Sequence, residues 1–232
     1  MKKGIAFILT VLLTSAIILF FYTKHLDSRL NELEHENTLL NAQNRQLQAE
    51  STYQIEKVDV KLTGDYNYWA SIEELAKTMV DDSEGRFKKT WAIYLANEAT
   101  QYDLDPFIVY ELLKVETGHT FDPELVGPDT IYGNAYGMSQ FMKNTAPWIA
   151  EMAGLPYEDD LLFDPYYSMQ LAIVYLDFLY HKYDNWDEAL TAYNRGMTGM
   201  ENYKAANGSA RSQYADQILR RAERYDSIAM VN

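Results

Sequence analysis

The pattern of apolar and polar positions divides the chain into an apolar N-terminal segment, a polar heptad segment and a long helical region. The first segment, Gly4–Thr23, contains no charged residue and consists mostly of Ile, Leu, Phe, Val and Ala. Its 20 residues would form a helix about 30 Å long, which matches the hydrocarbon core of a bilayer. Lys2 and Lys3 precede it, and no pair of small residues typical of a signal-peptide cleavage site ends it. We therefore expect residues 1–24 to be an uncleaved transmembrane anchor, with the rest of the chain outside the cytoplasm.

A leucine heptad follows within residues 25–50. The core positions hold mostly leucine, with asparagine twice: Leu26, Leu33, Leu40 and Leu47 at d, and Leu30, Asn37 and Asn44 at a. A buried asparagine amide is best tolerated where it pairs with its copy, so the pattern favours a parallel homodimer through a short coiled-coil stalk. The alternative is a single helical stalk that only spaces the following domain from the membrane.

Residues 51–66 break the heptad and are predicted to be a linker, whereas the apolar spacing of residues 67–232 is helical almost everywhere. Start and stop signals delimit three of these helices: from Asp105-Pro106 to Gly118, from Asp164-Pro165 to about Tyr183, and from Asn185 to Asn194, where Gly196 follows. No run shows sustained β alternation, although residues 121–136 could hold a short hairpin. The predicted fold class is mainly α.

Composition excludes several kinds of chemistry. The chain has no cysteine, which excludes disulfides, thiolate metal sites and a cysteine nucleophile. Its histidines show no metal-ligand spacing, so we expect no metal and no cofactor. The net charge is −14, and residues 61–232 carry −13 of it. A field of this sign opposes contact with phosphate backbones, which makes nucleic acid a poor candidate ligand.

The first predicted helix carries two glutamates in different environments. Leu112 and Leu113 lie four and three residues before Glu116, so Glu116 continues their apolar face. Glu111 lies with Lys114 toward the other side, where we expect it to be solvated. Burial and the helix C-terminus both raise the pKa of Glu116, which suits an acid catalyst. Taken alone, such a glutamate is more often structural and bonded to a backbone amide.

Three short motifs surround Glu116 in a fixed order. They are Glu116-Thr117 followed by Phe121-Asp122-Pro123, then Asn134-Ala135-Tyr136-Gly137-Met138-Ser139-Gln140 followed by Thr145-Ala146, and finally Ala192-Tyr193-Asn194-Arg195-Gly196. Residues 104–196 thereby resemble the lytic transglycosylase (SLT) family of the goose-type lysozyme-like superfamily. The resemblance implies a lysozyme-like helical domain at residues 67–232. It also implies that peptidoglycan glycan strands are the binding partner.

The sequence departs from the family pattern near the first two motifs. Thr117 stands where the family has serine and keeps the hydroxyl. The interval from Glu116 to Phe121 is longer than usual, and residues 127–133 resemble an insertion. Lys143 stands where proline is common. These differences concern the loop and the fit of the substrate, not the position of the acid.

The resemblance implies a reaction that needs one carboxylate. Glu116 would protonate the β-1,4 glycosidic oxygen between N-acetylmuramic acid (MurNAc) and N-acetylglucosamine (GlcNAc), and then deprotonate the muramyl 6-hydroxyl to close a 1,6-anhydro ring. Tyr193 would bond near Glu116 or the substrate acetamido group, while Gln140, Asn194 and the backbone around Met138 would line the cleft. The positions so assigned to substrate binding are Thr117, Gly137, Met138, Gln140, Tyr193 and Asn194.

Two other functions fit the same residues. A muramidase would use water as the attacking group, and it would need a second carboxylate, for which Asp122 and Asp129 are the nearest candidates. Asp122 precedes a proline and is better explained as a turn residue. A non-catalytic glycan-binding scaffold of a cell-envelope machine is the other alternative.

Overall fold

The computed structural model describes residues 22–26, 29–30, 33, 66–130 and 133–229. The chain forms two compact units, residues 1–48 and residues 49–232. In the first unit, residues 22–26 are helical and exposed. Most of the predicted anchor and stalk, and nearly all of the predicted linker, lie outside the described residues. Across the ranges given above, no helix is long and apolar enough to cross a membrane.

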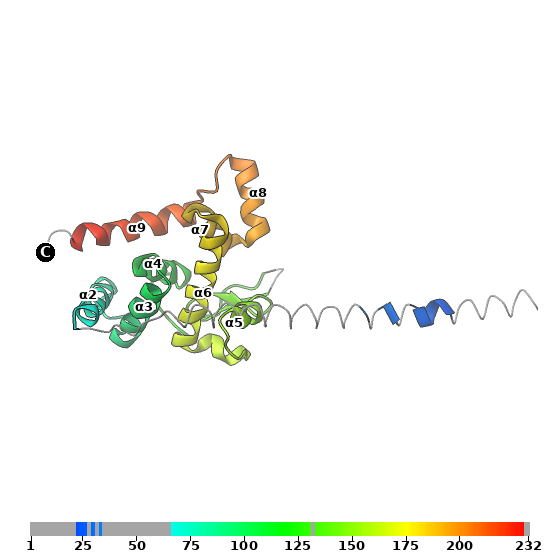
Figure 1. The fold of residues 1–232 in the computed structure, drawn as a ribbon, viewed down its shortest axis with the longest axis horizontal. Coiled ribbons are helices and arrows are strands. Elements are labelled where there is room, and N and C mark those ends of the chain that lie inside the picture. The colour runs from blue at the N-terminus through cyan, green and yellow to red at the C-terminus, as the bar shows by residue number, and fades with distance from the viewer. Residues whose placement is uncertain (1–21, 27–28, 31–32, 34–65, 131–132, 230–232) are drawn as a thin grey trace, which may run out of the picture. The chain divides into compact units, whose positions relative to one another are not determined.

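The second unit is mainly helical, as predicted, and its elements are labelled in Figure 1. In chain order they are α2 (Tyr66–Asp82), α3 (Lys89–Gln101), α4 (Pro106–Glu116), β1 (Ala135–Tyr136), β2 (Phe141–Met142), α5 (Ala146–Met152), the 3₁₀ helix η1 (Asp159–Phe163), α6 (Pro165–Tyr183), α7 (Trp186–Arg195), α8 (Met197–Asn207) and α9 (Gln213–Ala229).

Side-chain caps fix the starts of the three helices predicted from the sequence. The Asp105 carboxylate accepts a hydrogen bond from the backbone amide of Phe107 at 2.8 Å. Asp164 accepts one from Tyr167 at 2.9 Å, and the Asn185 side chain accepts one from Glu188 at 3.1 Å. Each bond satisfies an amide that the first helical turn leaves without a partner. The predicted starts of α4, α6 and α7 are therefore confirmed.

The β structure lies slightly later in the chain than expected. β1 pairs with β2 in an antiparallel hairpin, in which Ala135 faces Met142 and Tyr136 faces Phe141. The segment 121–136, where we expected the hairpin, contains β1 at its end, and an isolated bridge joins Val126 to Tyr136. The hairpin thus closes over the second motif, because β1 and β2 flank residues 137–140.

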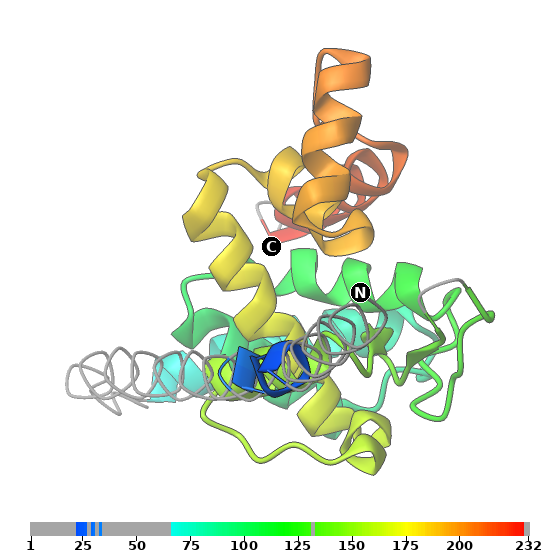
Figure 2. The same cartoon turned by 90° about the vertical axis from the view of Figure 1, so that its right-hand side faces the viewer.

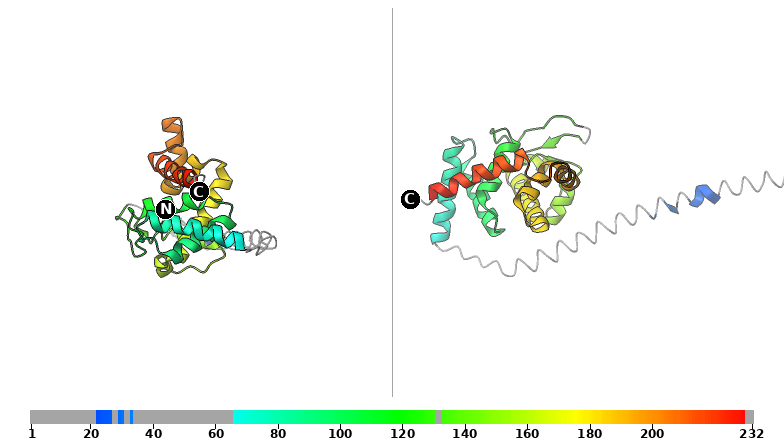
Figure 3. Two further views of the ribbon diagram at one scale, coloured as in Figure 1. Left: turned by 90° about the vertical axis from the view of Figure 1, so that its left-hand side faces the viewer. Right: turned by 90° about the horizontal axis from the view of Figure 1, so that it is seen from above.

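Helix α4 lies between other helices. It packs against α9 on one side and α2 and α3 on the other (Figure 1). Its residues from Phe107 to Leu113 are all buried. Seen from above in Figure 3, α9 extends from near α7 towards α2. Helix α8 projects away from the body of the unit and packs against α7 (Figure 2). Helix α4 is therefore covered from both sides over most of its length.

Candidate active site

Glu116 is the last residue of α4 and is partly exposed. The hydroxyl of Tyr214 donates a hydrogen bond to its Oε1 at 2.6 Å. Tyr214 lies in the first turn of α9 and is 98 residues away in the sequence, so helix packing alone brings the two together. The site joins the end of one helix to the start of another.

The environment of Glu116 favours its protonated form. Burial is the main cause, and it raises the pKa of Glu116 from 4.5 to about 7, although the hydrogen bond from Tyr214 acts in the opposite direction. Burial, followed by the charge of Glu116, raises the pKa of both Tyr214 and Tyr193 well above 10. Tyr193 therefore lies close enough to sense the Glu116 carboxylate.

The turn after Glu116 adopts an unusual backbone that Thr117 supports. Gly118, His119 and Phe121 all have positive φ angles, between 55° and 71°. The Thr117 hydroxyl donates to the Leu113 carbonyl at 2.8 Å and accepts from the Phe121 amide at 3.0 Å. Thr117 is only 3% exposed, so its hydroxyl acts within the fold and closes the end of α4.

The second motif forms a tight loop held by its own backbone and by Gln140. Gly137 has a φ of +71°, and a Cβ there would lie 1.9 Å from the Leu162 carbonyl oxygen, so only glycine fits. Met138 is fully buried. The Gln140 amide donates to the Gly137 carbonyl at 2.7 Å and to the Leu125 carbonyl at 3.3 Å. Gln140 is partly exposed, and its Oε1 lies beside Gly127, where an added Cβ would be 2.6 Å away.

The third motif reaches the second through Tyr193. The Tyr193 hydroxyl donates to the Ser139 carbonyl at 3.1 Å, and its ring packs beside Phe141 and Tyr175. Asn194, the next residue, is exposed. Tyr193 thus bonds to the loop and lies within the influence of the Glu116 charge, while Tyr214 makes the direct bond to the carboxylate.

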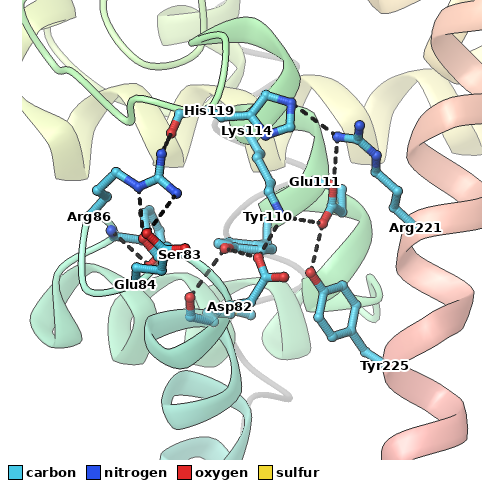
Figure 4. Close-up of polar contacts among 12 residues, drawn as sticks. Asp82, Ser83, Glu84, Arg86, Tyr110, Glu111, Lys114, His119, Arg221 and Tyr225 are labelled. Carbon is cyan, nitrogen blue, oxygen red and sulfur yellow. Dashed lines mark hydrogen bonds and ion pairs between the residues drawn. The ribbon is translucent and has the colours of Figure 1, made fainter.

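Glu111 differs from our expectation. We expected a solvated carboxylate, but Glu111 is only 1% exposed. The expectation was wrong because both faces of α4 are covered, one by α2 and α3 and the other by α9. Its carboxylate is held by Lys114, Tyr225 and Arg221, which are drawn in Figure 4.

The two candidate second carboxylates are both exposed. The Asp122 side chain accepts a bond from the Glu124 amide at 3.0 Å, which makes it the turn residue that the sequence predicted. No carboxylate of the described residues is among the groups that shift the pKa of Glu116. Over the same residues, no cluster of three or more His, Asp or Glu side chains could hold a metal ion.

Sequence reasoning missed Tyr214 and the serine pair that supports the loop. Ser139 donates to the Ser168 carbonyl at 2.6 Å, and the Ser168 hydroxyl accepts from the Ser139 amide at 3.1 Å. Both serines are buried, Ser139 in the loop between β1 and β2 and Ser168 in the first turn of α6. A tyrosine at the apolar face of the last helix was the available signal for Tyr214, but nothing local in the sequence connects it to Glu116.

Comparison with known proteins agrees with this geometry. The family model of the transglycosylase SLT domain matches residues 93–215, a range that holds Glu116, the loop, Tyr193 and Tyr214. No curated protein matches the sequence. Among solved structures, an inactive mutant of the lytic transglycosylase Slt from Pseudomonas aeruginosa is similar, with a TM-score of 0.51 and 20% sequence identity.

That similarity covers 78% of this chain but only 30% of the Pseudomonas protein. At this level of identity it shows a shared fold, which confirms the expected lysozyme-like helical domain. The family match spans more than half of the sequence, from Ile93 to Ala215. This chain therefore belongs to the SLT transglycosylase family, whose members are lytic transglycosylases.

Proposed function

We propose that this chain cleaves the glycan strands of peptidoglycan, the substrate that the SLT domain suggests. The bond cleaved is the β-1,4 bond between MurNAc and GlcNAc, and the product carries a 1,6-anhydro-MurNAc end. The observation that carries the proposal is Glu116, a partly exposed carboxyl whose pKa is raised to about 7 and which is bonded to one tyrosine. No cofactor takes part.

The reaction uses Glu116 twice. Protonated Glu116 gives its proton to the glycosidic oxygen, which leaves as the GlcNAc hydroxyl when the bond to the MurNAc C1 breaks. The N-acetyl oxygen of the substrate stabilises the cationic C1. The Glu116 carboxylate then takes the proton of the MurNAc 6-hydroxyl, whose oxygen bonds to C1, so Glu116 ends protonated again. No water is consumed.

The surroundings of Glu116 suit both steps. Burial keeps a large fraction of the carboxyl protonated near neutral pH, which the first step requires. The Tyr214 hydroxyl donates to the carboxylate, so it stabilises the ionised form that exists between the two steps. A side chain that must be acid and then base needs a pKa near the working pH, and these two opposing influences supply it.

Two alternatives make different demands. A hydrolytic muramidase needs a second carboxylate to activate water, but the candidates Asp122 and Asp129 are both exposed, and Asp122 bonds within its own turn. A non-catalytic scaffold would need neither the raised pKa of Glu116 nor the Tyr214 bond. Both features therefore argue against the scaffold.

One experiment separates the three functions. Purified peptidoglycan is digested with the full-length chain, and the released muropeptides are analysed by mass spectrometry. We expect 1,6-anhydro ends, which are 18 Da lighter than reducing ends because the ring closes without water. Reducing ends would identify a muramidase, and absence of any product would identify a scaffold.

A further inference from the structure

A buried ionic cluster surrounds Glu111 (Figure 4). Glu111 lies in α4, five residues before Glu116. Its Oε1 accepts hydrogen bonds from the Tyr225 hydroxyl at 2.7 Å and from Lys114 Nζ at 3.1 Å. Arg221 Nη1 lies 3.5 Å from its Oε2. A carboxylate that is 1% exposed is costly unless it is paired, and these groups compensate it.

Two of the three partners of Glu111 belong to α9. Arg221 and Tyr225 follow Tyr214 by seven and eleven residues, a spacing that places all three on one face of a helix. The Tyr225 ring also stacks on Phe107 of α4 with a centroid separation of 4.2 Å. Helix α9 is therefore bonded to α4 at two points, by Tyr214 at Glu116 and by Tyr225 and Arg221 at Glu111.

Arg221 also reaches the turn that follows Glu116. Its Nη1 lies 3.3 Å from His119 Nε2, and Arg86 Nη1 donates to the His119 carbonyl at 3.1 Å. Burial and then the nearby cations, Arg221 first, lower the pKa of His119, so the neutral ring can accept a bond from Arg221. His119 has a φ of +71°, a conformation that needs support in a residue with a Cβ.

The start of α9 is fixed separately. The buried Thr191 hydroxyl donates to the Ala210 carbonyl at 2.6 Å and lies 2.7 Å from the Ser212 hydroxyl. That contact holds the segment just before Tyr214, but a helix held at one end can still tilt. The cluster at Glu111 supplies the second point. The SLT family match ends at Ala215, so Arg221 and Tyr225 lie beyond it.

We propose that Glu111 is a positioning residue, which holds the far end of α9 through Tyr225 and Arg221 and so keeps the Tyr214 hydroxyl on Glu116. This inference rests on the proposed function, because it gives the Tyr214 bond a part in glycan cleavage. Glu111 itself does not touch the substrate. It acts through α9 and through the turn at His119.

A double-mutant cycle of Glu111→Gln and Tyr214→Phe tests the proposal in the full-length chain. We expect each single variant to lower kcat about tenfold, because a small displacement of a group in the active site slows the reaction strongly. The kcat of the double variant should lie less than about threefold below that of Tyr214→Phe, because Glu111 acts through Tyr214. Losses that multiply, to about a hundredfold, would overturn the proposal.

Matched variants separate positioning from folding. Glu73→Gln makes the same substitution on α2, where Glu73 forms an exposed ion pair with Lys89 of α3, and it should leave kcat unchanged. Circular dichroism and thermal unfolding check that each variant folds. If Glu111→Gln does not fold, Tyr225→Phe removes one hydrogen bond to Glu111 without changing charge and takes its place in the cycle.

A measurement without substrate tests the positioning role of Glu111 without relying on enzyme activity. The pKa of Glu116 can be followed by NMR in protein with ¹³C-labelled glutamate, with Glu116→Gln to assign the signal. The Tyr214 bond lowers the pKa of Glu116, so its loss in Glu111→Gln should raise that pKa, whereas the mere removal of a negative charge would lower it. A lowered or unchanged pKa would overturn the proposal. Wild-type protein that cut no glycan would instead contradict the proposed function and leave this test intact.

Discussion

At the scale of single residues, the environment of Glu116 opposes ionisation and stabilises the ionised form at once. Burial raises its pKa to about 7, and the Tyr214 hydroxyl stabilises the carboxylate. Neither influence alone would serve an acid that must become a base. The combination keeps both protonation states accessible near neutral pH.

Replacing Glu116 by glutamine should remove glycan cleavage without unfolding the domain. The amide has the same shape but cannot deliver a proton, and acid catalysis contributes about 10²–10⁴-fold to the rate. Release of soluble muropeptides measures the loss. Glu201→Gln, at an exposed position of α8, is the control and should cleave at the wild-type rate. Substantial turnover by Glu116→Gln would contradict our assignment of the acid.

The same substitution should stabilise the fold at alkaline pH. The folded-state pKa of Glu116 is about 7, above its ordinary value of 4.5. The contribution of this carboxyl group to the free energy of unfolding is therefore complete below pH 4.5 and is lost as pH rises through 7. Glutamine does not titrate. At pH 8 we therefore expect Glu116→Gln to melt about 3 °C higher than wild type, and at pH 4 to melt at nearly the same temperature. If the difference in melting temperature between the variant and wild type were the same at pH 4 and pH 8, burial would not raise the pKa of Glu116.

At the scale of elements, the loop between β1 and β2 depends on a close approach to η1. A Cβ at Gly137 would lie 1.9 Å from the Leu162 carbonyl oxygen. Gly137→Ala should therefore destabilise the domain by about 3 kcal/mol and reduce cleavage, because the loop must move. Urea unfolding measures the first effect. Gly154→Ala is the matched control, since Gly154 also has a positive φ but has no atom within 4 Å of the added carbon. It should cost only about 1 kcal/mol, and equal losses at the two positions would mean that the contact with Leu162 is unimportant.

Local signals predicted the helix starts but not the partners of the helices. Asp105 and Asp164 act on amides two or three residues away, so their effect can be read from the sequence. The apolar face of α4 correctly placed Glu116 against other side chains. The same reasoning failed for Glu111, because α4 is covered on both sides over the buried stretch Phe107–Leu113 that contains it. The contact of Tyr214 with Glu116 could not be predicted from the sequence, because it depends on how α9 packs.

At the scale of the whole molecule, we propose that residues 1–24 anchor the chain and hold the SLT domain outside the cytoplasm. The uncharged segment Gly4–Thr23 lacks a small-residue cleavage site, so we expect it to remain in the mature protein. N-terminal sequencing and intact mass of the membrane fraction would measure this. A soluble mature form that begins near Thr23 would contradict the anchor.

We also propose that residues 25–50 pair with a second copy of the chain. Leucine at four d positions supplies the seam, and two chains anchored in one membrane share an orientation and a high effective concentration. The natural chain has no cysteine, so single cysteines report cleanly. Asn37→Cys, at an a position, should crosslink readily under mild oxidation, and His35→Cys, at an outward position, should do so less. Equal crosslinking, or none, would indicate a spacer that does not pair.

The separation of Glu116 and Tyr214 along the chain has a consequence for synthesis. Glu116 is made first, and the hydroxyl that stabilises its carboxylate follows 98 residues later, on α9. If cleavage needs that bond, a nascent or prematurely terminated chain that lacks α9 carries an acid without its partner. Under the proposed function, glycan cleavage could then begin only after the ribosome has made α9 and α9 has packed against α4.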